Sequence, residues 1–105
     1  MNQINSVIVE GNLVNGKREE KVFIFSISAN RFYKDRNGEE QVETSFFDVE
    51  SWGNLADLCE RQFEKGRGIR IVGRLKQKRW TDECGKLHSK VVLIAEHVEL
   101  KPRKK

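Results

Sequence analysis

The chain has 105 residues, of which 37% are hydrophobic and 34% charged, and it contains a single proline. This length fits one domain, and the composition is that of a folded module rather than a disordered tail. No apolar run approaches the roughly 18 residues of a membrane span, and the first residues lack the layout of a signal peptide. We therefore expect an intracellular, cytoplasmic protein.

The chain has two cysteines, Cys59 and Cys84, which do not form a CxxC pair. His88 and His97 are too scattered to complete a zinc site with them. Two reduced thiols are favoured over a disulfide in a cytosolic protein, and no metal or other cofactor is expected.

The net charge of +4 is unevenly distributed along the chain. Residues 1–64 carry seven lysines and arginines against twelve aspartates and glutamates, whereas residues 65–105 carry thirteen against four. A basic half of this kind favours a polyanionic partner, although an ordinary solvated surface has the same appearance.

The chain begins with the two-residue period of β-strands. Residues 6–13 are apolar and β-branched, and Gly11 within them predicts a bulge or bend. The pair Asn15–Gly16 predicts a turn, and residues 21–31 are expected to form a long second strand. A polar loop with a second Asn-Gly pair follows at residues 34–41.

The third strand, residues 43–52, directs its side chains alternately to two faces. Phe46 and Phe47 are adjacent, so one of them is expected in the core, and the alternation selects Phe47 together with Val49. The opposite face carries Phe46, Asp48, Glu50 and Trp52.

The period changes to that of a helix over residues 53–66, with apolar side chains at Leu55, Leu58, Cys59 and Phe63. Asn54 is the expected N-cap and Gly66 the expected stop. This is the one helix that we expect, and its exposed face is mostly acidic, so it is unsuited to a DNA major groove.

Strand period returns over residues 68–80 and 87–100, which a turn at 81–86 separates. The order of three strands, a helix and two strands predicts an all-β fold, a five-stranded Greek-key OB-fold barrel over residues 1–100. A β-sandwich would normally have seven strands, and a parallel α/β fold would have a helix after each strand. Residues 101–105 are expected to form a basic, mobile end.

The fourth strand carries a row of cations that ends in a tryptophan. Alternation places one set on one face of this strand, namely Ile69, Ile71, Gly73 and Leu75. The other face carries Arg70, Val72, Arg74, Lys76, Lys78 and Trp80. A sequence-tolerant binder of single strands needs cations for the phosphates and flat rings for the bases along one groove. This face is therefore a candidate nucleic-acid surface.

Further aromatic residues could belong to the same surface. Phe46 and Trp52 share a face of the third strand, although core packing of Trp52 is a close alternative. Phe32 and Tyr33 end the second strand, and at least one of them is expected to be exposed. Two acidic residues, Asp48 and Glu50, share the face of Phe46 and Trp52 and would repel phosphate.

Four segments carry a resemblance to a known family: VIVEGNL at 7–13, ETSFFDVESWGNLADLCERQFEKG at 43–66, IRIVGRLKQKRWTDECGK at 69–86 and VVLIAEHVEL at 91–100. In this order they resemble the blocks of bacterial single-stranded DNA-binding proteins. The most specific part is WGNLA followed about twenty residues later by GRLKQKRWTDECG. The resemblance runs from about Ile4 to Leu100.

The resemblance implies an OB fold that assembles as a homotetramer, or a dimer, and wraps single-stranded DNA without catalysis. Its cellular roles would be DNA replication, recombination and repair in the cytoplasm, at the nucleoid. Base stacking would fall on Trp80, Trp52, Phe46 and either Phe32 or Tyr33. Phosphate contacts would come from Arg74, Lys76, Lys78, Arg79, Lys34 and Lys65. By strict alternation, Arg79 points away from the other cations of its strand.

The chain departs from the family pattern in two places. Only residues 14–21 separate the first two strands, where the family has a longer segment, and the chain ends at KPRKK without the acidic tail of the family. The alternative is a tailless OB-fold primosomal or replication-restart adaptor that docks partner proteins. A metal-dependent nuclease using Asp48 and Glu50 is a third hypothesis, but no third ligand is spaced to join them.

Overall fold

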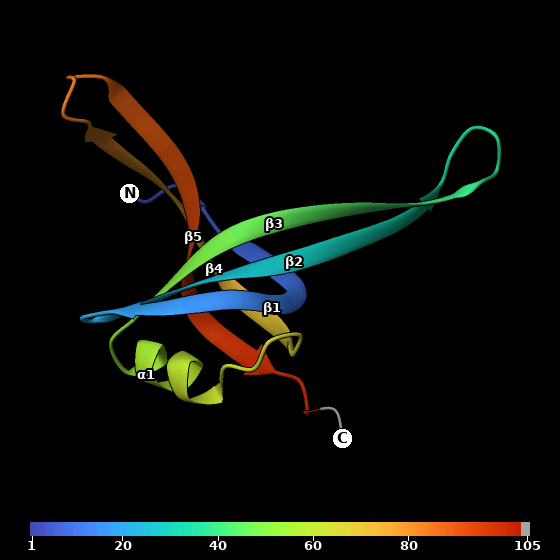
Figure 1. The fold of residues 1–105 in the computed structure, drawn as a ribbon, viewed down its shortest axis with the longest axis horizontal. Helices are drawn as coiled ribbons and strands as arrows, with labels where there is room; N and C mark the ends of the chain where they lie inside the picture. Colours follow the sequence, from blue (N-terminus) through green and yellow to red (C-terminus); the bar gives the residue numbers. More distant parts are fainter. Residues whose placement is uncertain (104–105) are drawn as a thin grey trace.

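The computed structural model describes residues 1–103. Within them it contains five strands, β1 (Val7–Glu19), β2 (Val22–Lys34), β3 (Glu40–Trp52), β4 (Gly68–Thr81) and β5 (Leu87–Leu100), and one helix, α1 (Gly53–Gln62), between β3 and β4. The strands close into a barrel in the order β1-β2-β3-β5-β4 (Figure 1). The predicted five-stranded OB-fold barrel is confirmed.

The barrel closes because β1 bends and changes partner. Its first half, residues 7–12, pairs with β4, and its second half, residues 12–19, pairs with β2. Gly11 lies at this change of partner, where a Cβ atom would stand 2.5 Å from the carbonyl oxygen of Ser28. A side chain is excluded there, so the bend predicted at Gly11 has a steric cause.

The turn predicted at Asn15–Gly16 is wrong, because both residues lie inside β1. Gly16 pairs with Phe25, and a Cβ atom on Gly16 would stand 2.5 Å from the ring of Phe23. The glycine therefore makes room for a core ring instead of forming a turn. The chain reverses at Glu20 and Lys21, where Glu20 adopts a positive φ of 51°.

The core fills the barrel, and α1 covers one end of it (Figure 1). The largest fully buried apolar side chains are Phe25, Ile27, Val49, Ile69 and Ile71. From the helix side, Ala56 and Cys59 are buried against them. The ring of Phe63 meets that of Phe23 edge to face, with centroids 5.9 Å apart. One modest core therefore supports the whole fold.

The ends of α1 differ from the expectation. Trp52 is the N-cap residue, and its side chain makes no capping hydrogen bond, whereas the predicted cap, Asn54, lies inside the helix. The helix ends at Phe63 rather than at Gly66. Gly66 instead has a φ of 87° in the following loop and donates its backbone N–H to the carbonyl of Leu13, which ties this loop to β1.

Two hairpins leave the barrel as long arms (Figure 1). The parallel pairing of β3 with β5 is limited to Val49–Leu93 and Glu50–Ile94. Beyond this short contact the strands diverge into a β2–β3 arm, residues 29–45, and a β4–β5 arm, residues 74–92. Most side chains of the arms are exposed on both faces, since no second layer covers them.

The core prediction for Phe47 is wrong for this reason, and Leu75, on the same face of β4 as the buried Ile71, is uncovered as well. Phe47 is 42% exposed and Leu75 is 47% exposed. Their strands keep the alternation of the sequence, but the barrel wall ends at Val49 on β3 and at Gly73 on β4. An inward-facing side chain beyond those residues reaches the open mouth between the arms rather than the core.

The C-terminal end contacts the barrel as far as it is described. Lys101 donates its backbone N–H to the carbonyl of Gly68, and its own carbonyl accepts a hydrogen bond from Arg67. Arg103 pairs with Glu64 at 3.1 Å. Residues 104–105, the rest of the end expected to be mobile, lie outside the described residues. Among the described helices, none is long and apolar enough to cross a membrane.

Candidate nucleic-acid interface

The face of β3 that points away from the core presents two exposed rings, one in the middle of the strand and one at its end. Phe46 is 68% exposed and Trp52 is 50% exposed. Both belong to the face that also carries Asp48 and Glu50, because these four residues alternate along one strand. Trp52 leans over the turn between β1 and β2, beside Lys21. The close alternative of a core role for Trp52 does not fit its exposure.

The β2–β3 arm separates the two adjacent candidates Phe32 and Tyr33. They point to opposite faces of β2, and Phe32 lies on the face of Phe46. Phe32 is 77% exposed, whereas Tyr33 is 39% exposed and lies under the guanidinium of Arg31, 4.8 Å from the ring centroid. Of the two, Phe32 has the ring that is free to meet a ligand.

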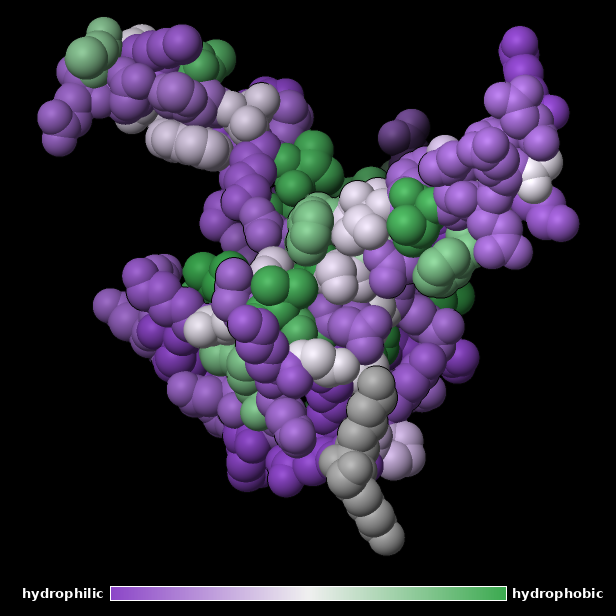
Figure 2. Space-filling view, turned by 45° about the vertical axis from the view of Figure 1, so that its right-hand side comes forward, coloured by the Kyte–Doolittle hydropathy of each residue, from purple (hydrophilic) through white to green (hydrophobic). Residues whose placement is uncertain are grey.

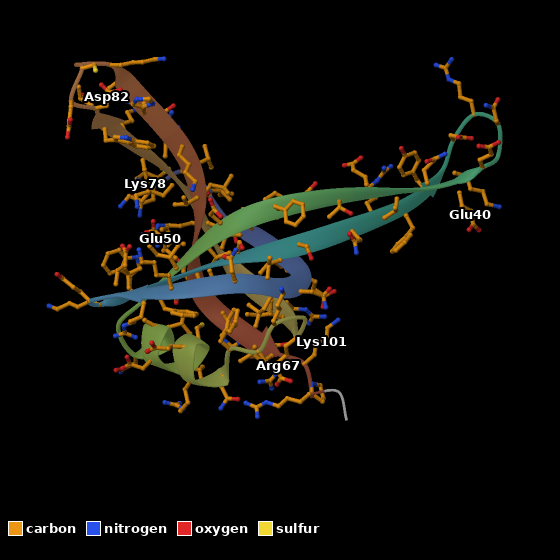
Figure 3. All side chains as sticks on the ribbon, viewed as in Figure 1. Glu40, Glu50, Arg67, Lys78, Asp82 and Lys101 are labelled. Carbon is orange, nitrogen blue, oxygen red and sulfur yellow. The ribbon has the colours of Figure 1, made fainter. Side chains whose placement is uncertain are left out.

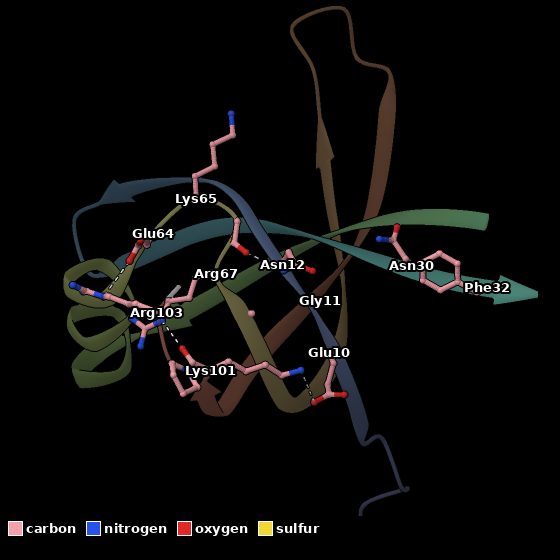
Figure 4. A pocket seen from close by; sticks show the side chains of 13 residues that line it. Glu10, Gly11, Asn12, Asn30, Phe32, Glu64, Lys65, Arg67, Lys101 and Arg103 are labelled. Atoms are coloured by element: carbon pink, nitrogen blue, oxygen red, sulfur yellow. Dashed lines mark hydrogen bonds and ion pairs between the residues drawn. The ribbon is translucent and has the colours of Figure 1, made fainter. Parts of the chain in front are cut away.

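Phe32 also borders a basic pocket between β1, β2 and the loop after α1 (Figure 4). Three of its cations already have protein partners. Arg67 bonds Gln62 and the carbonyl of Lys101, Lys101 pairs with Glu10, and Arg103 pairs with Glu64. Lys65 points away from these ion pairs in Figure 4 and, among residues 1–103, has no carboxylate within ion-pair distance.

Trp80 stands on the β4–β5 arm and is 48% exposed. One face of its indole is stacked on His88, its direct partner across the ladder, with centroids 5.5 Å apart and planes inclined by 16°. His88 Nε2 lies 2.7 Å from Oδ2 of Asp82. The other oxygen of Asp82 accepts the N–H groups of Cys84 and Lys86 at the tip. The turn thus fixes His88, and His88 supports Trp80.

These contacts also affect the pKa of Asp82. The hydrogen bond from His88, and then the N–H of Lys86, lower the pKa of Asp82 below its usual value. Sequence reasoning missed both His88 and Asp82. The sequence did contain a sign of the contact between His88 and Trp80, because a hairpin with its turn at residues 82–86 pairs these two residues across the ladder.

Two ion pairs join the β4–β5 arm to β3. The residues of the first pair, Lys78 and Glu50, are labelled in Figure 3. Lys78 Nζ donates to Oε2 of Glu50 at 2.6 Å, and Lys90 pairs with Asp48. Glu50 is only 3% exposed. The side chains beside these pairs form a small cleft, which we call the arm cleft, lined by Ile24, Asp48, Glu50, Lys78, Arg79, Trp80, Lys90 and Val92.

The remaining predicted cations are spread over several faces. Arg74 pairs with Glu96 at 3.3 Å, and Arg79 bonds Gln77, two residues earlier on the face opposite to Lys78. The pairing of β4 with β5 is regular around Arg79, so its side chain stays on the face opposite to Lys78, as the alternation predicts. Within residues 1–103, Lys34 and Lys76 have no carboxylate at ion-pair distance.

An apolar hollow opens at the mouth between the arms, where Figure 2 shows hydrophobic side chains gathered. It is lined by Val7, Val9, Phe46, Phe47, Leu75, Val91, Val92 and Leu93, with Asp48 and Lys90 at its edge. Phe47, which was expected in the core, and Leu75 both belong to this surface.

Comparison with known proteins assigns the chain to a family. The model of the single-strand binding protein family matches residues 4–101. The chain is similar to a single-stranded DNA-binding protein of Aquifex aeolicus, with 46% identity over 77% of this chain and 54% of that protein. It is also similar to single-stranded DNA-binding protein 2 of Chlorobaculum tepidum, with 30% identity over 100% of this chain and 76% of that protein.

Solved structures show the same fold. The SSB of Plasmodium falciparum, in complex with ssDNA, superposes with a TM-score of 0.83 at 21% identity over 97% of this chain and 98% of that one. A small single-stranded DNA-binding protein from Streptomyces coelicolor gives 0.70 at 20% identity, over 96% of both chains. The chain spans about half the length of several of the curated relatives it matches. The protein belongs to the single-strand binding protein family.

Proposed function

We propose that this protein binds single-stranded DNA with little sequence preference, stacking bases on exposed rings and contacting phosphates through lysines and arginines. One observation carries the proposal. Phe32, Phe46, Trp52 and Trp80 leave between 48% and 77% of their surface exposed, outside a core that is already filled. Exposed flat rings serve any base, because every base has a π-face.

The cations support the same function. Lys34, Lys65 and Lys76 have no carboxylate partner within residues 1–103, so phosphates would meet no competing protein anion at these lysines. Arg74 and Lys78 are paired with carboxylates and would contribute less, whereas Arg79 bonds only the neutral amide of Gln77. Each phosphate neutralised on a single strand changes the slope of log K against log salt by about −0.7. These three lysines alone would contribute about −2 to the slope for the single chain.

We assign the protein a non-catalytic role in protecting single strands during replication, recombination and repair, in the cytoplasm at the nucleoid. The relatives that support this role are themselves named single-stranded DNA-binding proteins. The carboxylates of the nuclease hypothesis, Asp48 and Glu50, each face a lysine, which occupies the position that a metal ion would need.

The proposal includes a homo-oligomer. Its support is the apolar surface around the mouth, where Val91 is 58% exposed beside Phe47 and Leu75. A second copy that covered this surface would bury it, which is the usual fate of a contiguous apolar patch. A chain that stays monomeric would favour the adaptor function instead, with a partner protein on the same surface.

Titration with an oligo-dT strand tests the function directly. Both tryptophans are half exposed, so stacked bases should quench their fluorescence strongly at low salt, and added salt should weaken binding. Sedimentation of the same samples measures the assembly state. Unchanged tryptophan fluorescence at low salt, with no slower-migrating complex on a gel, would contradict the proposed function.

A further inference from the structure

Two lysines of the β4–β5 arm form ion pairs with two carboxylates of β3. Asp48 and Glu50 lie two residues apart, so their side chains leave the same face of the strand. Lys78 and Lys90 are direct partners across the β4–β5 ladder. Lys78 meets Glu50 at 2.6 Å, and Lys90 meets Asp48. The charges of these four side chains cancel beside Trp80.

Glu50 requires its lysine. It is 3% exposed, and within residues 1–103 Lys78 is the one cation at ion-pair distance from its carboxylate. A buried carboxylate that loses its partner is strongly destabilising, because it has already given up its hydration. If a phosphate bound Lys78 in place of Glu50, the carboxylate of Glu50 would be buried without a cation partner. Lys78 therefore offers a phosphate much less than a free lysine does.

The ring of Trp80 is not affected by this cancellation. Stacking of a base on an indole requires an exposed face and no net charge, and His88 covers only one face of this indole. A duplex presents phosphates but keeps its bases paired and stacked on one another. At the arm cleft the two lysines that could contact the phosphates of a duplex are neutralised, and the paired bases of a duplex cannot stack on Trp80. The exposed bases of a single strand can still stack on this ring.

We propose that Asp48 and Glu50 are specificity-determining residues, which neutralise Lys78 and Lys90 so that the arm cleft favours exposed bases over phosphate charge. The inference rests on the proposed binding of single-stranded DNA. It adds a reason why a duplex gains little at this surface, and why binding there tolerates salt.

The test is a double variant, Asp48→Asn/Glu50→Gln, which keeps the side-chain shapes and removes both charges. Its matched control is Asp57→Asn/Glu60→Gln, which also removes two carboxylates from ion pairs, both made to Arg18. These control residues lie on α1, at the end of the barrel away from the β4–β5 arm (Figure 1). Binding of a dT oligonucleotide and of a duplex of equal length is measured over a salt series.

If Lys78 and Lys90 are released, the salt slope for dT should steepen by about 0.7 for each lysine, or about 1.4 in total. The slope for the duplex should steepen by about 1.8, which is about 0.4 more than the change for dT. Relative to about 1 M salt, the preference for the single strand at about 50 mM salt should therefore fall about threefold. The control variant should keep the slopes of the wild-type protein, because Arg18 lies away from the cleft.

Unchanged slopes in a variant with the wild-type melting temperature would overturn the inference. A loss of dT affinity at every salt concentration would also overturn it, since the carboxylates would then serve binding instead of restraining phosphate contacts. If the double variant unfolds, the single variant Asp48→Asn tests the inference, because the Asp48 side chain is 40% exposed and its replacement should be tolerated. Its salt slope for dT should steepen by about 0.7. Failure of the wild-type protein to bind dT would overturn the proposed function and the inference together.

Discussion

The two arms end in the same turn and differ in what the turn holds. Asp35 accepts the N–H groups of Asn37 and Glu39, and Asp82 accepts those of Cys84 and Lys86, at the same spacing. A glycine with positive φ follows each aspartate by three residues, at 77° in the β2–β3 arm and 80° in the β4–β5 arm. Aspartate and glycine at these positions suit the turn locally, so both hairpins close in the same way.

The residue six positions after each aspartate makes the difference. In the β2–β3 arm it is Gln41, whose amide bonds Asp35. In the β4–β5 arm it is His88, which contacts Asp82 and carries the ring of Trp80. The β4–β5 arm is also tied to β3 by two ion pairs. One turn geometry therefore gives a simple hairpin in one arm and a supported aromatic platform in the other.

Among the variants that test this difference between the arms, Trp80→Ala should have the largest effect on binding of dT. Loss of the platform should weaken dT binding by about 1–3 kcal/mol. The melting temperature should change little, because Trp80 lies outside the core. Phe32→Ala, on the other arm, is the matched variant and should weaken binding less, since Phe32 has no stacked partner ring among the described residues. Isothermal titration and thermal melting measure the two effects. A large drop in melting temperature with unchanged affinity would show that Trp80 is structural.

A smaller effect is expected from His88→Ala, compared with Gln41→Ala at the equivalent position. A stacked ring pair contributes about 0.5–1.5 kcal/mol, so His88→Ala should weaken dT binding by about two- to tenfold. It should also shift the indole N–H resonance of Trp80, because the neighbouring ring current is lost. Gln41→Ala should do neither. Equal effects of the two variants would mean that His88 acts only through the turn.

The smallest effect concerns acid titration of the two turns. The pKa of Asp82 is lowered first by His88, and that of Asp35 first by the N–H of Glu39. Because both values are depressed in the fold, each aspartate stabilises its hairpin above its unfolded pKa, and this stabilisation is lost as pH falls through the folded value. His88→Ala should return the pKa of Asp82 toward normal, while Gln41→Ala should leave most of the shift at Asp35. Carboxyl NMR titrations measure both, and a shift at Asp82 that survives His88→Ala would contradict the assignment.

The sequence predicted most of the local structure because local rules govern it. The two-residue period located five strands, and the change of period located α1. Alternation placed Phe46, Asp48, Glu50 and Trp52 on one face of β3, as the structure has them. The later turns at residues 34–41 and 81–86 were expected from their glycines. The exposure of Trp80 also followed, since cations surround it along β4.

Other features escaped prediction because they depend on segments far apart in the chain. An Asn-Gly pair is typical of a turn, but a glycine can also be required where a neighbouring side chain leaves no room for a Cβ atom. At Gly16 the ring of Phe23 fills that space, so the glycine lies inside a strand. Phe47 and Leu75 keep the alternation of core residues, yet the barrel ends before them. The support of Trp80 by His88 depends on the hairpin register, which the sequence leaves open until the turn is placed.

By itself the sequence determined which residue types face outward together, because a strand's period follows from its backbone. This includes the row of cations ending in Trp80. Only the tertiary structure decided which of those cations are free. Lys78 is bound by Glu50, 28 residues away, because β3 and β5 meet for two residue pairs and bring the β4–β5 arm across β3. Periodicity assigns a side chain to a face, but its partner across that face depends on how the barrel closes.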